Sequence, residues 1–173
     1  MQSVKTDRIL RLAIAGLLAV FVSVLYRSFH ERIVSVGDTA PDFTIATDSG
    51  RTISTSNFGG RLLVLNFWAT WCPPCVEEMP SLDEFQKKLA GSGVVVLGVS
   101  VDKDAGAYQA FLKRANVSFL TARDPQARIS AEYGTFKYPE TYIIDTRGKV
   151  VQKIIGPENW NDERMVSYVK SLL

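Results

Sequence analysis

The sequence predicts an α/β fold, in which helices flank a central mixed sheet, together with an N-terminal β-hairpin and one N-terminal transmembrane helix. Three observations predict it: short apolar strand-like runs alternate with amphipathic helical segments, a hairpin and a helix close the chain, and an uncharged apolar run lies near the start. We therefore expect a cytoplasmic tail and membrane anchor over residues 1–32. Residues 33–173 have the usual size of a single domain with one core.

Hydrophobic periodicity places the elements of that domain in order. Residues 36–43 lead into a hairpin that turns at Ser49 and Gly50 and returns through residues 52–53. The expected strands of the sheet are residues 62–68, 94–101, 142–145 and 150–155, the last two joined by a turn at 146–148. The expected helices are residues 74–89, 105–115, 126–133 and 160–172.

Both cysteines of the chain stand two residues apart, as Cys72-Pro73-Pro74-Cys75, where a buried strand gives way to a helix. This spacing lets the sulfurs form a disulfide or lie side by side as thiols, which is typical of redox sites. Because the two prolines suit a first helical turn, Cys72 is expected at the helix N-terminus. There the partial positive charge favours the thiolate and lowers the pKa of Cys72 below about 8.5. Cys72 is therefore the expected attacking thiol, and the covered Cys75 the resolving thiol.

Two cysteines can also serve other purposes. A structural disulfide over so short a loop would restrict the unfolded chain little. Zinc would need two further ligands, and the only histidine, His30, lies beside the N-terminal apolar segment. Two thiolates can hold Cu(I), so a copper-delivery or metal-binding module remains the alternative; otherwise we expect no metal and no cofactor. The peroxidase motif needs Thr or Ser three residues before the first cysteine, where this chain has Ala69.

Several separated motifs occur in a fixed order along the domain. They are Trp68-Ala69-Thr70-Trp71-Cys72-Pro73-Pro74-Cys75, Glu77-Glu78-Met79-Pro80, Gly98-Val99-Ser100-Val101-Asp102 and Tyr138-Pro139-Glu140-Thr141-Tyr142-Ile143-Ile144-Asp145-Thr146-Arg147-Gly148. From about residue 35 onward the chain resembles the membrane-anchored thioredoxin-like proteins of the TlpA/ResA/CcmG (DsbE) group. The resemblance implies a thioredoxin-like fold with a central insert near residues 105–133. It also implies a thiol–disulfide oxidoreductase, and it favours the reduction of protein disulfides.

The resemblance also implies a substrate-binding region. In thioredoxin-like folds the bond that matches Tyr138–Pro139 is cis and faces the disulfide, with the preceding backbone free to pair with an extended substrate. Only about 5–6% of X-Pro bonds are cis, so this expectation depends on the family. Trp71, next to Cys72, is expected to line the substrate groove. Tyr138 and Trp71 could equally be packed aromatic residues.

Glu78 is the candidate proton carrier. Thioredoxin has a buried aspartate six residues before its first cysteine, but this chain has Asn66 there, which cannot ionise. Glu78 lies one helical turn after Cys75 and on the same face, and the matching glutamate of ResA-like proteins is a buried acid. Burial would raise its pKa and let it take up and return the proton of Cys75. Alternatively, Glu78 only stabilises the helix dipole. Its neighbour Glu77 is expected to face solvent.

The N-terminal segment predicts a single-pass inner-membrane protein with its domain on the periplasmic side. Residues 12–26 carry no charge, and counting from residue 9 gives a helix of about 27 Å, against a hydrocarbon core of roughly 30 Å. Lys5, Arg8 and Arg11 precede the run, and Arg27 and Arg32 follow it with Glu31 between them. The resulting excess of positive charge before the run is modest and favours a cytoplasmic N-terminus. A cleaved signal peptide is the rival interpretation, although no small-x-small site lies near residues 22–28.

The expected partners follow from compartment and resemblance. A reductant outside the cytoplasm needs electrons from across the membrane, and the resemblance implies a donor of the CcdA/DsbD type. Its substrates would be proteins with disulfides or thiols, such as apocytochrome c or a copper-site protein. The 20 basic and 18 acidic residues give a net charge of +2, which leaves no broad basic face for nucleic acid.

Overall fold

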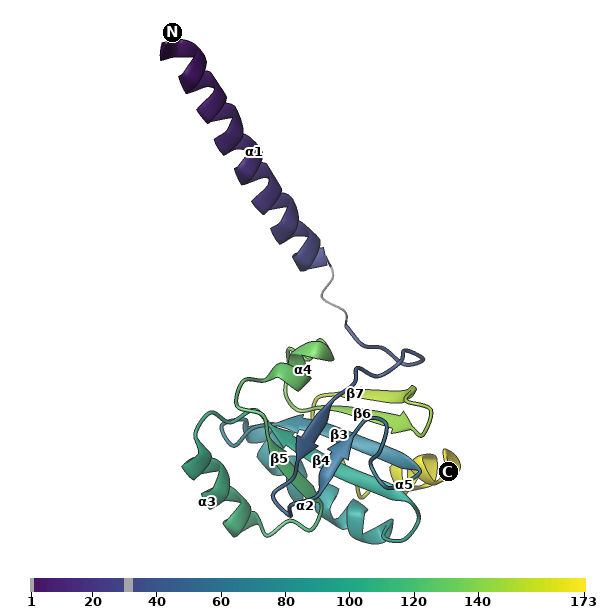
Figure 1. Ribbon diagram of the computed structural model, residues 1–173. Coiled ribbons are helices and arrows are strands. Elements are labelled where there is room, and N and C mark those ends of the chain that lie inside the picture. Colours follow the sequence, from purple (N-terminus) through teal and green to yellow (C-terminus); the bar gives the residue numbers. More distant parts are fainter. Residues whose placement is uncertain (1, 30–32) are drawn as a thin grey trace. The chain divides into compact units, whose positions relative to one another are not determined.

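The computed structural model describes residues 2–29 and 33–173, and it divides into two compact units, Met1–Arg32 and Ile33–Leu173. In the first unit a single helix, α1, spans Gln2–Phe29 (Figure 1). Among the described residues, no helix combines the length and the apolar character needed to cross a membrane. The transmembrane helix is therefore not confirmed and stays a prediction. His30 lies outside the described residues.

The second unit has seven strands and four helices (Figure 1). The strands are β1 (Thr44–Ala46), β2 (Thr52–Ser54), β3 (Leu62–Trp68), β4 (Val94–Ser100), β5 (Leu120–Arg123), β6 (Glu140–Asp145) and β7 (Val150–Ile155). The helices are α2 (Pro73–Lys88), α3 (Ala105–Ala115), α4 (Arg128–Glu132) and α5 (Glu163–Ser171). Strands β1 and β2 form the small antiparallel hairpin that the sequence predicts.

The other five strands form one mixed sheet in the order β5-β4-β3-β6-β7. Strand β3 is parallel to β4 and β4 to β5, whereas β6 is antiparallel to both β3 and β7. Parallel neighbours need a crossover, which α2 and α3 supply, and antiparallel β6 and β7 need only a tight turn. That turn contains Gly148 with a φ of +72°, a conformation that glycine adopts without strain. The predicted thioredoxin-like α/β fold is confirmed.

Strand β5 and helices α4 and α5 differ most from the sequence prediction. The sequence does not predict strand β5, because its four residues, Leu-Thr-Ala-Arg, contain no apolar run or clear alternation. Helix α4 is shorter than predicted. Helix α5 begins at Glu163 rather than Trp160, because the side chain of Asp162 accepts a hydrogen bond from the backbone N–H of Arg164 and caps the helix there.

Two apolar layers enclose the sheet, and β3 contributes to both because its side chains alternate between faces. Leu63, Leu65 and Phe67 pack with the hairpin and with residues 34–43 that lead into it, whereas Val64 and Trp68 pack against the helices. Asn66 lies between Val64 and Trp68 in this alternation, so a fully buried amide faces α2. The central strand therefore carries a polar side chain to the inner face of the helix that follows it.

Candidate active site

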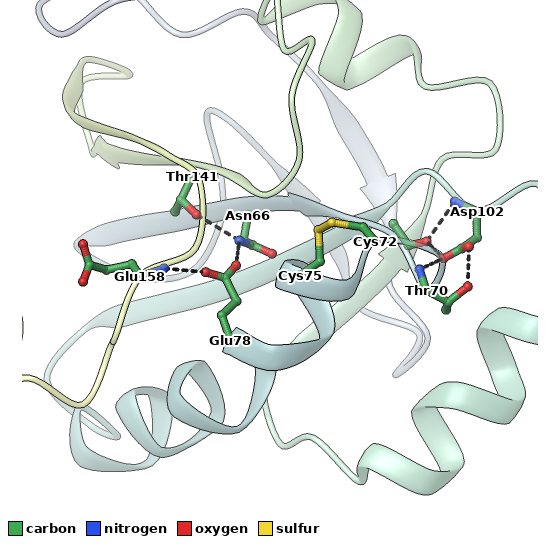
Figure 2. Close-up of a disulfide and its surroundings, with 9 residues drawn as sticks. Asn66, Thr70, Cys72, Cys75, Glu78, Asp102, Thr141 and Glu158 are labelled. Atoms are coloured by element: carbon green, nitrogen blue, oxygen red, sulfur yellow. Dashed lines mark hydrogen bonds between the residues drawn. A yellow bond between two sulfur atoms is a disulfide. The ribbon is translucent and has the colours of Figure 1, made fainter.

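The two cysteines lie at the start of α2 and are joined as a disulfide, with their Cα atoms 5.3 Å apart (Figure 2). Cys72 is the N-cap residue of α2, and its carbonyl accepts the backbone N–H of Val76 at 3.1 Å. Cys72 is 5% exposed and Cys75 is 0% exposed. The predicted position of Cys72 at the helix N-terminus is confirmed, and only Cys72 touches solvent.

A buried carboxylate fixes the turn that carries Cys72. Asp102, 2% exposed, follows β4 and accepts both the backbone N–H of Thr70 at 2.9 Å and its hydroxyl at 2.6 Å. The hydroxyl of Ser100 also donates to Asp102, at 2.6 Å. Hydrogen bonds to a charged acceptor are stronger than neutral ones, so the chain two residues before Cys72 is held rigidly (Figure 2).

Glu78 is buried behind the disulfide, on the same helix and facing the sheet. It is 4% exposed, and its Oε1 accepts the Nδ2–H of Asn66 at 2.8 Å. Its Oε2 accepts the backbone N–H of Glu158 at 3.0 Å and the indole N–H of Trp160 at 3.4 Å. Burial raises the pKa of Glu78 above its usual 4.5, and these hydrogen bonds only partly oppose that change. The expected burial of Glu78 is confirmed, and Glu77 is exposed as predicted.

The raised pKa of Glu78 predicts a specific pH dependence of stability. The folded state holds this proton more tightly than the unfolded state, so between the usual pKa of 4.5 and the raised pKa it binds more protons. Stability contributed by the protonated carboxyl is therefore lost as pH rises through that window, by about 1.4 kcal/mol for each pH unit that the window spans. Urea unfolding of Glu78→Gln should lack this loss. Parallel pH profiles for the variant and the wild type would contradict the assignment.

A pocket of about 310 Å³ separates α2 from the loop that follows β7 and reaches Glu78. Its walls include Glu78, Ser81, Glu158 and Asn159. Figure 2 shows the side chain of Glu158 pointing away from Glu78, whereas its backbone N–H binds the Glu78 carboxylate. This pocket therefore lies between the buried Glu78 and the solvent.

Trp71 and Tyr138 form an aromatic wall beside Cys72. Their rings meet edge to face, with centroids 6.1 Å apart, and Trp71 is 63% exposed. Both line a groove of about 500 Å³ together with Lys103 and residues 125–127. The Tyr138–Pro139 peptide bond is cis, as the resemblance implies, and Pro139 is buried. Within the described residues, the amide and carbonyl of Tyr138 make no backbone hydrogen bond.

The sequence does not reveal most of the partners of Glu78. The indole N–H of Trp160, a residue that the sequence places only at the start of a helix, donates to the carboxylate. Asn66 stands out in the sequence only as a residue that cannot ionise, although its amide joins Glu78 to Thr141 of β6. Nothing in the sequence indicates that the backbone N–H of Glu158 binds Glu78. In the part of the chain that the structure describes, no three metal-ligating side chains gather at one place.

Comparison with known proteins agrees with this geometry. Residues 35–173 match the Redoxin family model. The thiol-disulfide oxidoreductase ResA of Bacillus thuringiensis subsp. konkukian (strain 97-27) is 33% identical over 150 residues, which cover 86% of each chain. The thioredoxin-like protein YneN of Bacillus subtilis (strain 168) is 37% identical over 134 residues, 75% of this chain and 78% of that one.

A solved structure from Chlorobium tepidum, provisionally assigned as the thiol:disulfide interchange protein DsbE, is 29% identical with a TM-score of 0.73. The alignment covers 80% of this chain and 98% of that one. The fold, the disulfide at the helix N-terminus and these relatives agree on one chemistry. The chain belongs to the Redoxin family and is a thioredoxin-like thiol–disulfide oxidoreductase.

Proposed function

We propose that this oxidoreductase reduces disulfides of selected proteins outside the cytoplasm. The observation that carries the proposal is the unequal exposure of the two cysteines, since Cys72 is 5% exposed and Cys75 is fully buried. The helix N-terminus stabilises a thiolate on Cys72, which attacks one substrate sulfur and expels the other as a thiolate. The product is a mixed disulfide between Cys72 and the substrate.

Cys75 completes the exchange. Its thiolate attacks the sulfur of Cys72, restores the Cys72–Cys75 disulfide and releases the second substrate thiolate. Two electrons thus pass to the substrate. Glu78 accepts the proton of Cys75, a role supported by its burial, its raised pKa and its place one turn along α2. The pocket beside Glu78 gives that proton a route to solvent.

Substrate contact is assigned to Trp71, Tyr138 and Pro139. The exposed Trp71 ring and the edge-to-face Tyr138 offer a firm apolar surface, and the free backbone groups of Tyr138 can pair with an extended segment. Trp71, which directly precedes Cys72 in the chain, and Tyr138 line the same groove. We assign the groove to the polypeptide around the substrate cysteines.

Trp71→Ala should weaken substrate binding more than it slows the disulfide exchange itself. Loss of a central aromatic contact costs about 1–2 kcal/mol, so KM should rise about 5–30-fold with a smaller change in kcat. Steady-state reduction of a disulfide-bonded protein checks this. Phe136→Ala is the matched control, because Phe136 is 73% exposed but does not line the groove. Equal effects of the two substitutions would remove Trp71 from the substrate site.

Our proposals for the substrates and for the electron donor are based on the resemblance to the TlpA/ResA/CcmG group. It supports the haem-attachment cysteines of apocytochrome c or the copper-ligand cysteines of a copper-site protein as substrates, and a CcdA/DsbD-type membrane donor. Incubation of the reduced full chain with oxidised peptides of each class tests this directly. Preferential reduction of one class would support the proposal. Stoichiometric Cu(I) binding without any disulfide reduction would favour copper delivery instead.

Placement of the domain outside the cytoplasm rests on the sequence. The uncharged residues 12–26 lie within α1 and follow three basic residues. A C-terminal reporter that is active only in the periplasm should be active when fused to the full chain, and the fusion should stay with the membrane fraction. Reporter activity in the soluble periplasmic fraction would indicate a cleaved signal peptide.

A further inference from the structure

The Asn66 side chain donates hydrogen bonds to a residue of α2 and to a residue of β6. It projects from β3 toward α2 and is 0% exposed, and its strand neighbour on β6 is Thr141. Both Nδ2 protons are used: one is donated to Glu78 at 2.8 Å and the other to Thr141 at 2.9 Å. This orientation suits an ionised Glu78 carboxylate, which can only accept, and it turns the Oδ1 of Asn66 the other way.

The Oδ1 atom of Asn66 has no hydrogen-bond donor among the described residues, although it is buried. Figure 2 shows it pointing toward Cys75 at the start of α2. A buried acceptor left without a donor destabilises the state in which it occurs. In the disulfide state Cys75 cannot supply a donor, because its sulfur carries no hydrogen. After reduction Cys75 carries an S–H group, which is a weak donor.

We propose that Asn66 is a positioning residue whose Oδ1 accepts a hydrogen bond from the Cys75 thiol in the reduced protein. The inference deepens the proposed function and rests on it. Reduction adds two electrons and two protons, and one proton resides on Cys75 Sγ, where it faces Oδ1. When Cys75 later attacks the mixed disulfide, that proton passes to the Glu78 carboxylate. The Asn66 amide neither gains nor loses a proton. Its Oδ1 orients the Cys75 thiol, and its Nδ2 holds the Glu78 carboxylate that accepts the proton.

The bond should alter the redox balance of the pair. Asn66 destabilises the disulfide state through its unpaired oxygen and stabilises the dithiol state, so it favours reduction. Its removal should shift the equilibrium with a thiol buffer toward the disulfide about tenfold, or about 30 mV for a two-electron couple. The variant would thus be a stronger reductant but would hold Cys75 less well for the resolving step.

The first test is the redox equilibrium of full-length Asn66→Leu, whose side chain branches at the same atom and is larger but carries no acceptor. This equilibrium should be measured at about pH 6, where ordinary thiols stay protonated, in both the wild-type and the Glu78→Gln backgrounds. We expect the same shift in both backgrounds, because the bond does not involve the Glu78 charge. Thr141→Val is the matched control, since it removes the other partner of Nδ2 but leaves Oδ1 in place. It should shift the equilibrium less than about threefold.

A second measurement does not require the Asn66→Leu protein to fold well. In Cys72→Ser the only thiol of the chain is Cys75, so its S–H stretching band can be observed by infrared spectroscopy. The band should lie at the lower frequency of a hydrogen-bonded thiol. A free-thiol frequency, or a shift in Asn66→Leu that vanishes in the Glu78→Gln background, would overturn the inference. Failure of the wild-type protein to exchange disulfides would instead overturn the proposed function, so the two failures are distinguishable.

Discussion

Cys75→Ser should stop the reaction at the mixed disulfide and leave the substrate protein covalently joined to Cys72. Cys72, the partly exposed cysteine, is unchanged, but the group that would displace the substrate is gone. Turnover should fall to background. Non-reducing electrophoresis followed by mass spectrometry of the adduct identifies both the trapped proteins and the sulfur that holds them.

Cys72→Ser is the matched control for the trapping experiment. Cys75 is fully buried, so this variant should trap no substrate although it keeps one thiol. The order of the two steps depends on that difference. Adducts on Cys75 in comparable yield would mean that the buried sulfur is reached first, and the assigned roles would have to be exchanged.

Glu78→Gln should slow the resolving step about 10²–10⁴-fold, the usual loss when a positioned proton acceptor is removed. In the wild-type protein the carboxyl must be ionised to accept the proton of Cys75. The rate should therefore rise as pH passes through the raised pKa of Glu78, and this limb should be missing in the variant. Single-turnover release of substrate from the mixed disulfide, measured across pH, gives both quantities.

The neighbouring Glu77→Gln makes the same change of charge on the exposed side of α2 and provides the comparison. It should leave the rate and its pH profile close to those of the wild type. If Glu78→Gln behaves like Glu77→Gln, the carboxyl at position 78 is not the proton acceptor. It would then act only through the helix dipole.

Local sequence signals are sufficient to predict where the two cysteines lie in the fold. The strand that ends at Trp68, the two prolines and the spacing of the cysteines place Cys72 at the N-cap because each acts within a few residues. The cis bond before Pro139 and the burial of Glu78 come from the family resemblance, since neither has a local pattern strong enough to predict it.

The surroundings of Glu78 cannot be predicted in this way. Its partners Glu158 and Trp160 come from a loop about 80 residues further along the chain, and one of them donates through its backbone. Asp102 likewise meets Thr70 only because β4 pairs with β3. Such contacts depend on strand order and loop path, which hydrophobic periodicity does not specify.

The reduction potential of the Cys72–Cys75 pair tests the central claim most directly. It can be measured by equilibrating the full chain with thiol buffers and quantifying the disulfide fraction after alkylation. A dedicated reductant should have a potential near that of thioredoxin, about −270 mV. A value near −120 mV, where the oxidant DsbA lies, would contradict the account and make this protein an oxidase of thiols.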